Sequence, residues 1–144
     1  MFKKILVPVD VDYPETAAAV YQKANLLARQ SGAEIRLVSV MPGFGMPIVA
    51  AYIPEHVRRE ATERFNASVE QFIKDNCDET VSYAIRTGRN WEEIIKDADA
   101  WGADLIVVYH NHQHDLNEVF SGSCSQRVTD NASCSVLRLR NVVD

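Results

Sequence analysis

A histidine-rich segment that follows an apolar run contains the chain's most conspicuous set of metal-binding side chains. His110, His112 and His114 alternate, so an extended backbone would project all three imidazoles to one side. Imidazole nitrogens bind Zn²⁺ or Ni²⁺, and Asp115 or Cys124 could supply a fourth ligand. A polar, solvated loop explains the same spacing, because no second ligand cluster accompanies the triplet. We therefore expect no bound metal, with a metal site as the alternative.

The same segment ends in residues suited to holding an anion. Gly122 and Ser123 begin a predicted helix, where backbone N–H groups and the helix dipole attract negative charge. Cys124 and Ser125 continue that first turn. Simple capping of the helix is the competing interpretation of Gly122 and Ser123. Cys124 is interpreted as a buried, inert thiol, with a redox-sensitive thiol as the alternative.

No nucleophile, base and orienting residue can be combined into a catalytic set from this sequence. It contains no G-x-S-x-G segment, no Walker loop and no HExxH pair, and its carboxylates are scattered over helix faces. We therefore predict a protein that is not an enzyme, with slow ATP hydrolysis left open.

The composition limits the classes of partner. The 144 residues carry a formal net charge of −5, which argues against a surface for nucleic acid or anionic lipid. No apolar run approaches the ~18 residues of a membrane span, and Pro8 and Asp10 cut the first apolar run too short for a signal peptide. Three cysteines without CxxC spacing indicate free thiols in a reducing compartment. We expect one cytoplasmic domain spanning residues 1–144.

Short apolar runs alternate with helical periodicity along the whole chain. Strands are predicted at residues 3–10, 33–40, 80–88, 103–110 and 134–139, and residues 41–54 form a long loop. Helices are predicted from about Pro14, from about Pro54, from Asn90 and over residues 122–131. Asn90 is expected to be an N-cap, with Glu93 completing a capping box. This alternation predicts an α/β fold with a doubly wound parallel sheet.

In such a sheet, ligands bind beyond the carboxyl ends of the strands, where the strand order reverses. The predicted carboxyl ends are Asp10, Val40 and Tyr109 for the first, second and fourth strands. The histidine-rich segment therefore begins where a ligand would lie.

With these elements placed, the chain resembles the universal stress protein family over essentially its whole length. The resemblance is carried by four segments in the family's order: KKILVPVD, GAEIRLVSVMPG, TGRNWEEIIKDADAWGADLIVV and GSCSQRV…ASCSVLRLR. It implies an open five-stranded sheet of order 3-2-1-4-5 with helices on both faces, a Rossmann-like, adenine-nucleotide alpha hydrolase-like fold. It also implies a small regulatory protein of the stress response.

ATP-binding members of that family share a glycine motif after the fourth strand. Here its first two glycines are replaced by Tyr109 and His112, and its third is Gly122, followed by Ser123. Tyrosine and histidine do not allow the close backbone approach or the positive φ that glycine allows. We therefore expect ATP binding to be weak or lost, so that pure protein–protein interaction is the alternative function.

The resemblance implies a set of nucleotide-binding positions, with ATP or AMP as the possible ligand and no required cofactor. They are Pro8, Asp10, Val40, Val108, Tyr109, Asn111, His112, Gly122, Ser123, Cys124 and Ser125.

Family members also pair through their last strand, so the resemblance implies a homodimer, beside an unidentified regulatory protein partner. The interface positions are Val136, Leu137, Arg138 and Leu139. By period-two alternation, Leu137 and Leu139 share one face and Val136 and Arg138 the other. Arg138 could lie near its own symmetry mate or reach a carboxylate of the partner, which makes it the expected weak point of the dimer.

Overall fold

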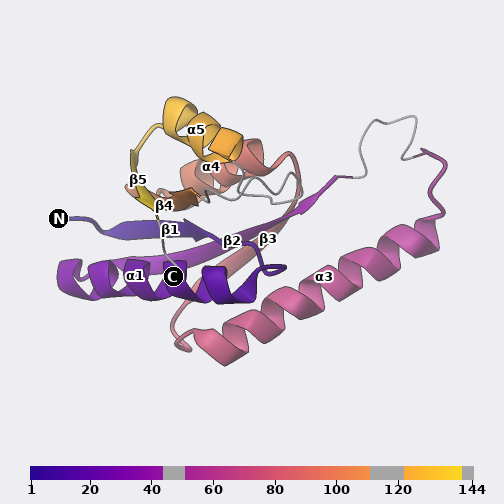
Figure 1. Cartoon of the computed structure of the whole chain (residues 1–144), viewed down its shortest axis with the longest axis horizontal. Coiled ribbons are helices and arrows are strands. Elements are labelled where there is room, and N and C mark those ends of the chain that lie inside the picture. The colour runs from indigo at the N-terminus through magenta and orange to yellow at the C-terminus, as the bar shows by residue number, and fades with distance from the viewer. Residues whose placement is uncertain (44–50, 111–121, 141–144) are drawn as a thin grey trace.

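The computed structural model describes residues 1–43, 51–110 and 122–140 (Figure 1). Five parallel strands form one sheet of order β3-β2-β1-β4-β5, which confirms the predicted fold class and strand order. The strands are β1 (Lys4–Pro8), β2 (Glu34–Pro42), β3 (Ser82–Gly88), β4 (Leu105–His110) and β5 (Ser135–Arg140).

Helices cover both faces of the sheet, as the fold class requires. They are α1 (Pro14–Ser31), α3 (Glu55–Asn76), α4 (Asn90–Trp101) and α5 (Gly122–Asn131). Figure 1 shows α1 and α3 on one side of the sheet and α4 and α5 on the other. Helix α4 packs on β2 and β3, whereas α5 packs on β4 and β5. None of the helices among the described residues is long and apolar enough to cross a membrane.

The core lies around the two central strands. Ile5, Leu6 and Val7 of β1 have no exposed surface, and neither do Ile106 and Val107 of β4. A strand covered on both faces needs apolar side chains at every position, which is why these two runs show no polar alternation. Their burial places the carboxyl ends of β1 and β4 at the centre of one sheet edge.

Two helices end as the sequence predicts. Gly32 follows α1 with φ 68°, and Gly102 follows α4 with φ 82°. Both values lie in the left-handed region, which side chains other than glycine adopt only at a cost. Each glycine N–H closes the helix by donating to the alanine carbonyl four residues earlier.

The predicted capping box of α4 is wrong. Asn90 is the first residue of the helix, and the N-cap is Arg89, which makes no side-chain cap hydrogen bond. The carboxylate of Glu93 pairs with Arg86 and Lys96 instead of reaching back to a cap. One tertiary and one local ion pair thus occupy the Glu93 carboxylate, and the helix starts one residue earlier than predicted.

The end of β2 and the burial of α3 also differ from the prediction. Strand β2 continues through Met41 to Pro42, which pairs with Gly88 of β3, so the loop begins later than expected. Only the second half of α3 places its apolar stripe in the core: Val69 and Phe72 are buried, whereas Val57 is 41% exposed. The first half of α3 extends beyond the sheet in Figure 1, which explains that exposure.

Candidate functional site

The two central strands separate at their carboxyl ends. Pairing of β1 with β2 continues to Pro8 and Val38, whereas pairing of β1 with β4 ends at Leu6 and Ile106. The strand order changes direction between β1 and β4, and ligands of doubly wound sheets bind at that point. The strands therefore diverge at the position where the sequence predicts a ligand-binding crevice.

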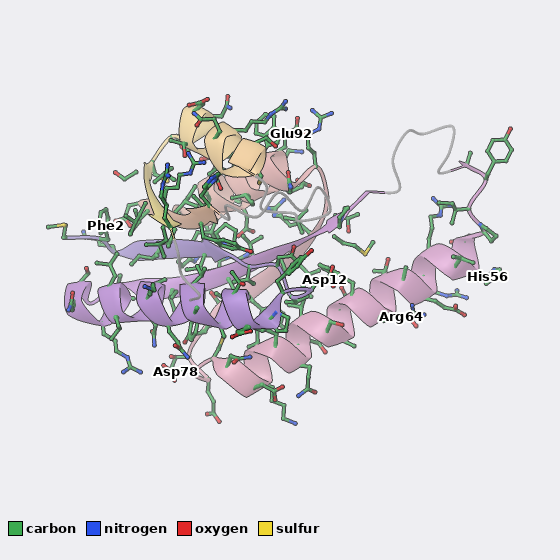
Figure 2. All side chains as sticks on the ribbon, viewed as in Figure 1. Phe2, Asp12, His56, Arg64, Asp78 and Glu92 are labelled. Carbon is green, nitrogen blue, oxygen red and sulfur yellow. The ribbon has the colours of Figure 1, made fainter. Side chains whose placement is uncertain are left out.

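The β1 side of the crevice is held by buried polar contacts. Asp10 is only 5% exposed, and its Oδ1 accepts the backbone N–H of Asp12 at 3.0 Å. Figure 2 places Asp12 in the turn between β1 and α1. Ser39 of β2 donates its hydroxyl to the Val9 carbonyl at 3.0 Å, and Val40 beside it is also buried. These contacts fix the carboxylate of Asp10 at the strand end.

The β4 side is tied to the start of α5. Val108 and Tyr109 are buried, and the Ser125 hydroxyl donates to the Tyr109 carbonyl at 2.7 Å. That contact anchors the first turn of α5, which begins at Gly122, against the end of β4. Asn111 and His112, which the resemblance also assigns to the site, lie outside the described residues.

The first turn of α5 contains one exposed and two buried side chains. Ser123 is exposed, whereas Cys124 and Ser125 are buried. Burial raises the pKa of the Cys124 thiol to about 12, so the thiol is protonated near neutral pH. This favours the inert interpretation of Cys124 over a reactive thiolate.

His110 is the one member of the histidine triplet that the structure describes. Arg138 Nη2 lies 2.9 Å from His110 Nδ1, and because guanidinium only donates, Nδ1 is the acceptor. His112, His114 and Asp115 lie outside the described residues. Among the residues that are described, no three His, Cys, Asp or Glu side chains gather as metal ligands.

At the last strand, the arginine contacts its own chain. Arg138 reaches His110 and, at 3.4 Å, Gln126 of α5, where we expected it to face its own copy or a carboxylate of the partner. Val136 and Leu139 pack against the core, whereas Leu137 is 39% exposed. Among the strands that the structure describes, β5 pairs with β4 alone and lies at the end of the sheet.

Sequence reasoning missed an ionic cluster under α4. Asp97 is 1% exposed and accepts two hydrogen bonds from Arg36 at 3.0 and 3.1 Å and one from Arg86 at 3.1 Å. A signal was available: Asp97 falls three residues after Ile94, on the apolar side of the helix. A carboxylate on a buried helix face indicates a cationic partner.

Comparison with known proteins identifies the family. The model of the "Universal stress protein family" matches residues 1–140. The chain belongs to the universal stress protein family. It is 30% identical to universal stress protein G of Shigella flexneri, over 97% of this chain and 100% of that protein.

Solved universal stress proteins share the fold. The structure matches universal stress protein UspA from Lactobacillus plantarum with a TM-score of 0.68 and 25% identity, covering 96% of this chain and 97% of that one. It also matches the universal stress protein from Archaeoglobus fulgidus in complex with dAMP, with a TM-score of 0.58 and 21% identity over 94% and 96% of the two chains. The family resemblance seen in the sequence is confirmed.

Proposed function

We propose that this universal stress protein is a ligand-responsive regulator that binds an adenine nucleotide weakly in the crevice between β1 and β4. The observation that carries the proposal is the buried carboxylate of Asp10 at the end of β1, next to the point where the strands separate. A carboxylate held by a backbone N–H is preorganised to accept hydrogen bonds from hydroxyl groups such as those of ribose. The solved relative in complex with dAMP supports an adenine nucleotide as the ligand class.

Weak binding of ATP is expected because two glycines of the family's motif are replaced in this chain. Tyr109 carries a side chain of which only 1% is exposed, where ATP-binding members have glycine. The substitution removes the freedom of the backbone to adopt positive φ and to approach a phosphate closely. We expect a dissociation constant for ATP near the millimolar range, which corresponds to a binding free energy of about −4 kcal/mol.

Isothermal titration with AMP and ATP tests this proposal. Asp10→Asn is expected to weaken AMP binding by about tenfold, because the carboxylate loses its charge-assisted hydrogen bonds. Asp12→Ala is the matched control, since Asp12 is an exposed neighbour in the same turn, and it should leave binding within about twofold. Equal binding by wild type and Asp10→Asn would place the nucleotide elsewhere. A dissociation constant for ATP near or below ~10 µM would contradict the weak affinity.

The exposed edge of β5 favours a second function, pairing with another copy. Leu137 is 39% exposed on the outermost strand, which presents unpaired backbone N–H and C=O groups. We expect light scattering to give about twice the chain mass and Leu137→Glu to give the monomer, because the substitution buries a charge at the interface. Leu26→Glu, at a 61% exposed position of α1, is the control. Arg138→Val should change the association little, since Arg138 already contacts its own chain.

The proposed compartment is the cytoplasm. Cys77, Cys124 and Cys134 are all free thiols. Free thiols are stable where glutathione and thioredoxin keep cysteines reduced.

A further inference from the structure

A small hollow lies between the first turns of α4 and α5, beside the candidate site. Its volume is about 200 Å³, and its lining consists of Arg89, Asn90, Trp91, Ser123, Cys124 and Arg127. Pockets for drug-sized ligands measure roughly 300–1,000 Å³. The hollow therefore suits a small group and not a whole nucleotide. Figure 2 shows this end of α4, marked by Glu92, next to α5.

The charge of the lining is one-sided. Its described residues include two arginines and no carboxylate, in a chain whose formal net charge is −5. Cys124 adds no negative charge near neutral pH, because burial raises the pKa of its thiol to about 12. Of the acidic residues in the first turn of α4, Glu93 pairs with Arg86 and Lys96, whereas Glu92 forms an exposed pair with Arg89 of the lining.

Among the described residues, Arg127 has an aromatic partner and no carboxylate partner. Its guanidinium carbon lies 5.7 Å from the centroid of the Trp91 ring, and no carboxylate of the described residues lies within ion-pairing distance. Stacking on an aromatic ring orients a guanidinium while leaving its edge free to bind oxygen atoms. The Trp91 Nε1–H is itself buried with no hydrogen-bond partner among the described residues. A buried N–H group without an acceptor is unfavourable, so a hydrogen bond from it to a ligand oxygen would stabilise the bound ligand.

Arg89, the N-cap residue of α4, lines the hollow on the side opposite to α5. Its Nη1 lies 3.1 Å from Glu92 Oε1, but this pair is exposed, with 63% and 40% of the two side chains accessible. An exposed pair three residues apart contributes little free energy, so a multiply charged anion can compete for the guanidinium. Two guanidinium groups from different helices thus face one small space.

We propose that Arg89 and Arg127 form a phosphate subsite between α4 and α5, which takes the terminal phosphates of a polyphosphorylated ligand. Ser123 lies in this lining and is also the residue after Gly122 in the glycine motif, so the subsite adjoins the crevice. A role of this subsite in nucleotide selection rests on the proposed function. If both hold, ATP should bind more tightly than AMP. The arginines supply charge where the substituted motif no longer supplies close backbone contacts.

Sodium tripolyphosphate tests the subsite without a nucleoside. Isothermal titration at low ionic strength should show saturable binding to the wild-type protein, since salt screens exposed charges. Arg89→Gln with Arg127→Gln should weaken it by at least about tenfold, because two charge-assisted contacts are lost. The matched control is Lys23→Gln with Arg59→Gln, which removes the same two charges at exposed positions of α1 and α3. Equal weakening in the control, or no saturable binding, would overturn the subsite.

Trp91 reports the location independently. The chain has two tryptophans, so in Trp101→Phe the fluorescence comes from Trp91 alone. Tripolyphosphate should change this fluorescence with the dissociation constant found by titration, because it disturbs the stacked Arg127. Saturable binding with unchanged fluorescence would place the anion elsewhere and overturn the assignment.

Comparing AMP with ATP separates the two proposals. Wild type should bind ATP about tenfold more tightly than AMP, and the double arginine variant should bind both equally with AMP affinity unchanged. Tripolyphosphate binding without AMP binding would sustain the subsite and refute the nucleotide crevice. AMP binding without tripolyphosphate binding, with ATP no tighter than AMP, would refute the subsite and leave the crevice standing.

Discussion

Two groups of arginines contact α4, and they differ in whether a buried carboxylate among the described residues pairs with them. In the first, here called the Asp97 cluster, Arg36 and Arg86 converge on Asp97, with Glu93 beside Arg86. In the second, the hollow between α4 and α5, Arg89 and Arg127 face a lining without a carboxylate. Only Arg89 belongs to α4, as its N-cap residue, whereas Arg36, Arg86 and Arg127 come from β2, β3 and α5, so tertiary packing brings these groups to the helix.

The difference distinguishes charges that hold the fold from charges available to a ligand. Asp97 is 1% exposed and accepts three hydrogen bonds, so it links β2, β3 and α4 in one network. A buried carboxylate that lost its partners would cost several kcal/mol. The arginines of the hollow support no such network, and their removal should cost the fold almost nothing.

The largest expected effect is at Asp97. Asp97→Ala should lower the free energy of unfolding by about 3 kcal/mol, because it leaves two half-buried guanidinium groups without their carboxylate. Urea denaturation measures the change. Glu70→Ala, at an exposed position of α3, is the control and should cost less than about 0.5 kcal/mol. A loss of unfolding free energy below about 1 kcal/mol for Asp97→Ala would show that the Asp97 cluster does not stabilise the fold.

A smaller effect is expected from Arg36→Lys. Lysine keeps the charge but cannot form the two parallel hydrogen bonds that Arg36 makes with Asp97, at 3.0 and 3.1 Å. It would also change the contact with the Trp101 ring, whose centroid lies 6.0 Å from the guanidinium carbon. We expect a loss of about 1–2 kcal/mol in urea denaturation. Arg29→Lys, in an exposed pair with Asp78, should change stability by less than about 0.5 kcal/mol; a comparable loss there would remove the distinction between buried and exposed pairs.

The pH dependence of stability tests whether the Cys124 thiol of the hollow is protonated. Burial raises the pKa of this thiol from 9.0 to about 12, so its folded-state pKa lies above the unfolded one. Its contribution to stability is therefore complete below pH ~9 and is lost as the pH rises towards ~12. Cys124→Ala should make the fall in unfolding free energy between these values shallower than in wild type. An unchanged slope would mean that folding does not raise the pKa of this thiol.

The smallest effect on stability is expected in the hollow itself. Arg89→Gln with Arg127→Gln should change the free energy of unfolding by less than about 0.5 kcal/mol, because neither guanidinium has a buried carboxylate partner. Thermal and urea unfolding measure it in the absence of phosphate. A loss as large as that of Asp97→Ala would assign these arginines to the fold and not to a ligand.

The fold could be predicted from the sequence much further than the site could. Apolar runs at β1 and β4, with Gly32 and Gly102 at the helix ends, are local signals, and each element formed where its signal lies. The capping box at Asn90 did not form, and Glu93 pairs instead with Lys96 on its own helix and with Arg86 of β3, a partner that only packing brings near. Arg138 likewise contacts His110 from the neighbouring strand, a contact that alternation along β5 cannot reveal.

The sequence by itself determined the element order, the buried central strands and the position of Asp10 and Gly122 at the strand and helix ends. These features depend on periodicity and on backbone preferences within a few residues. Only the tertiary structure decided which charges meet. Arg36 and Asp97 are 61 residues apart in sequence, and Arg127 comes to lie over Trp91 from another helix. Contacts of this kind depend on how the helices pack on the sheet, and the cost of burying a charge then determines which arginines need a carboxylate and which can remain available to an anion.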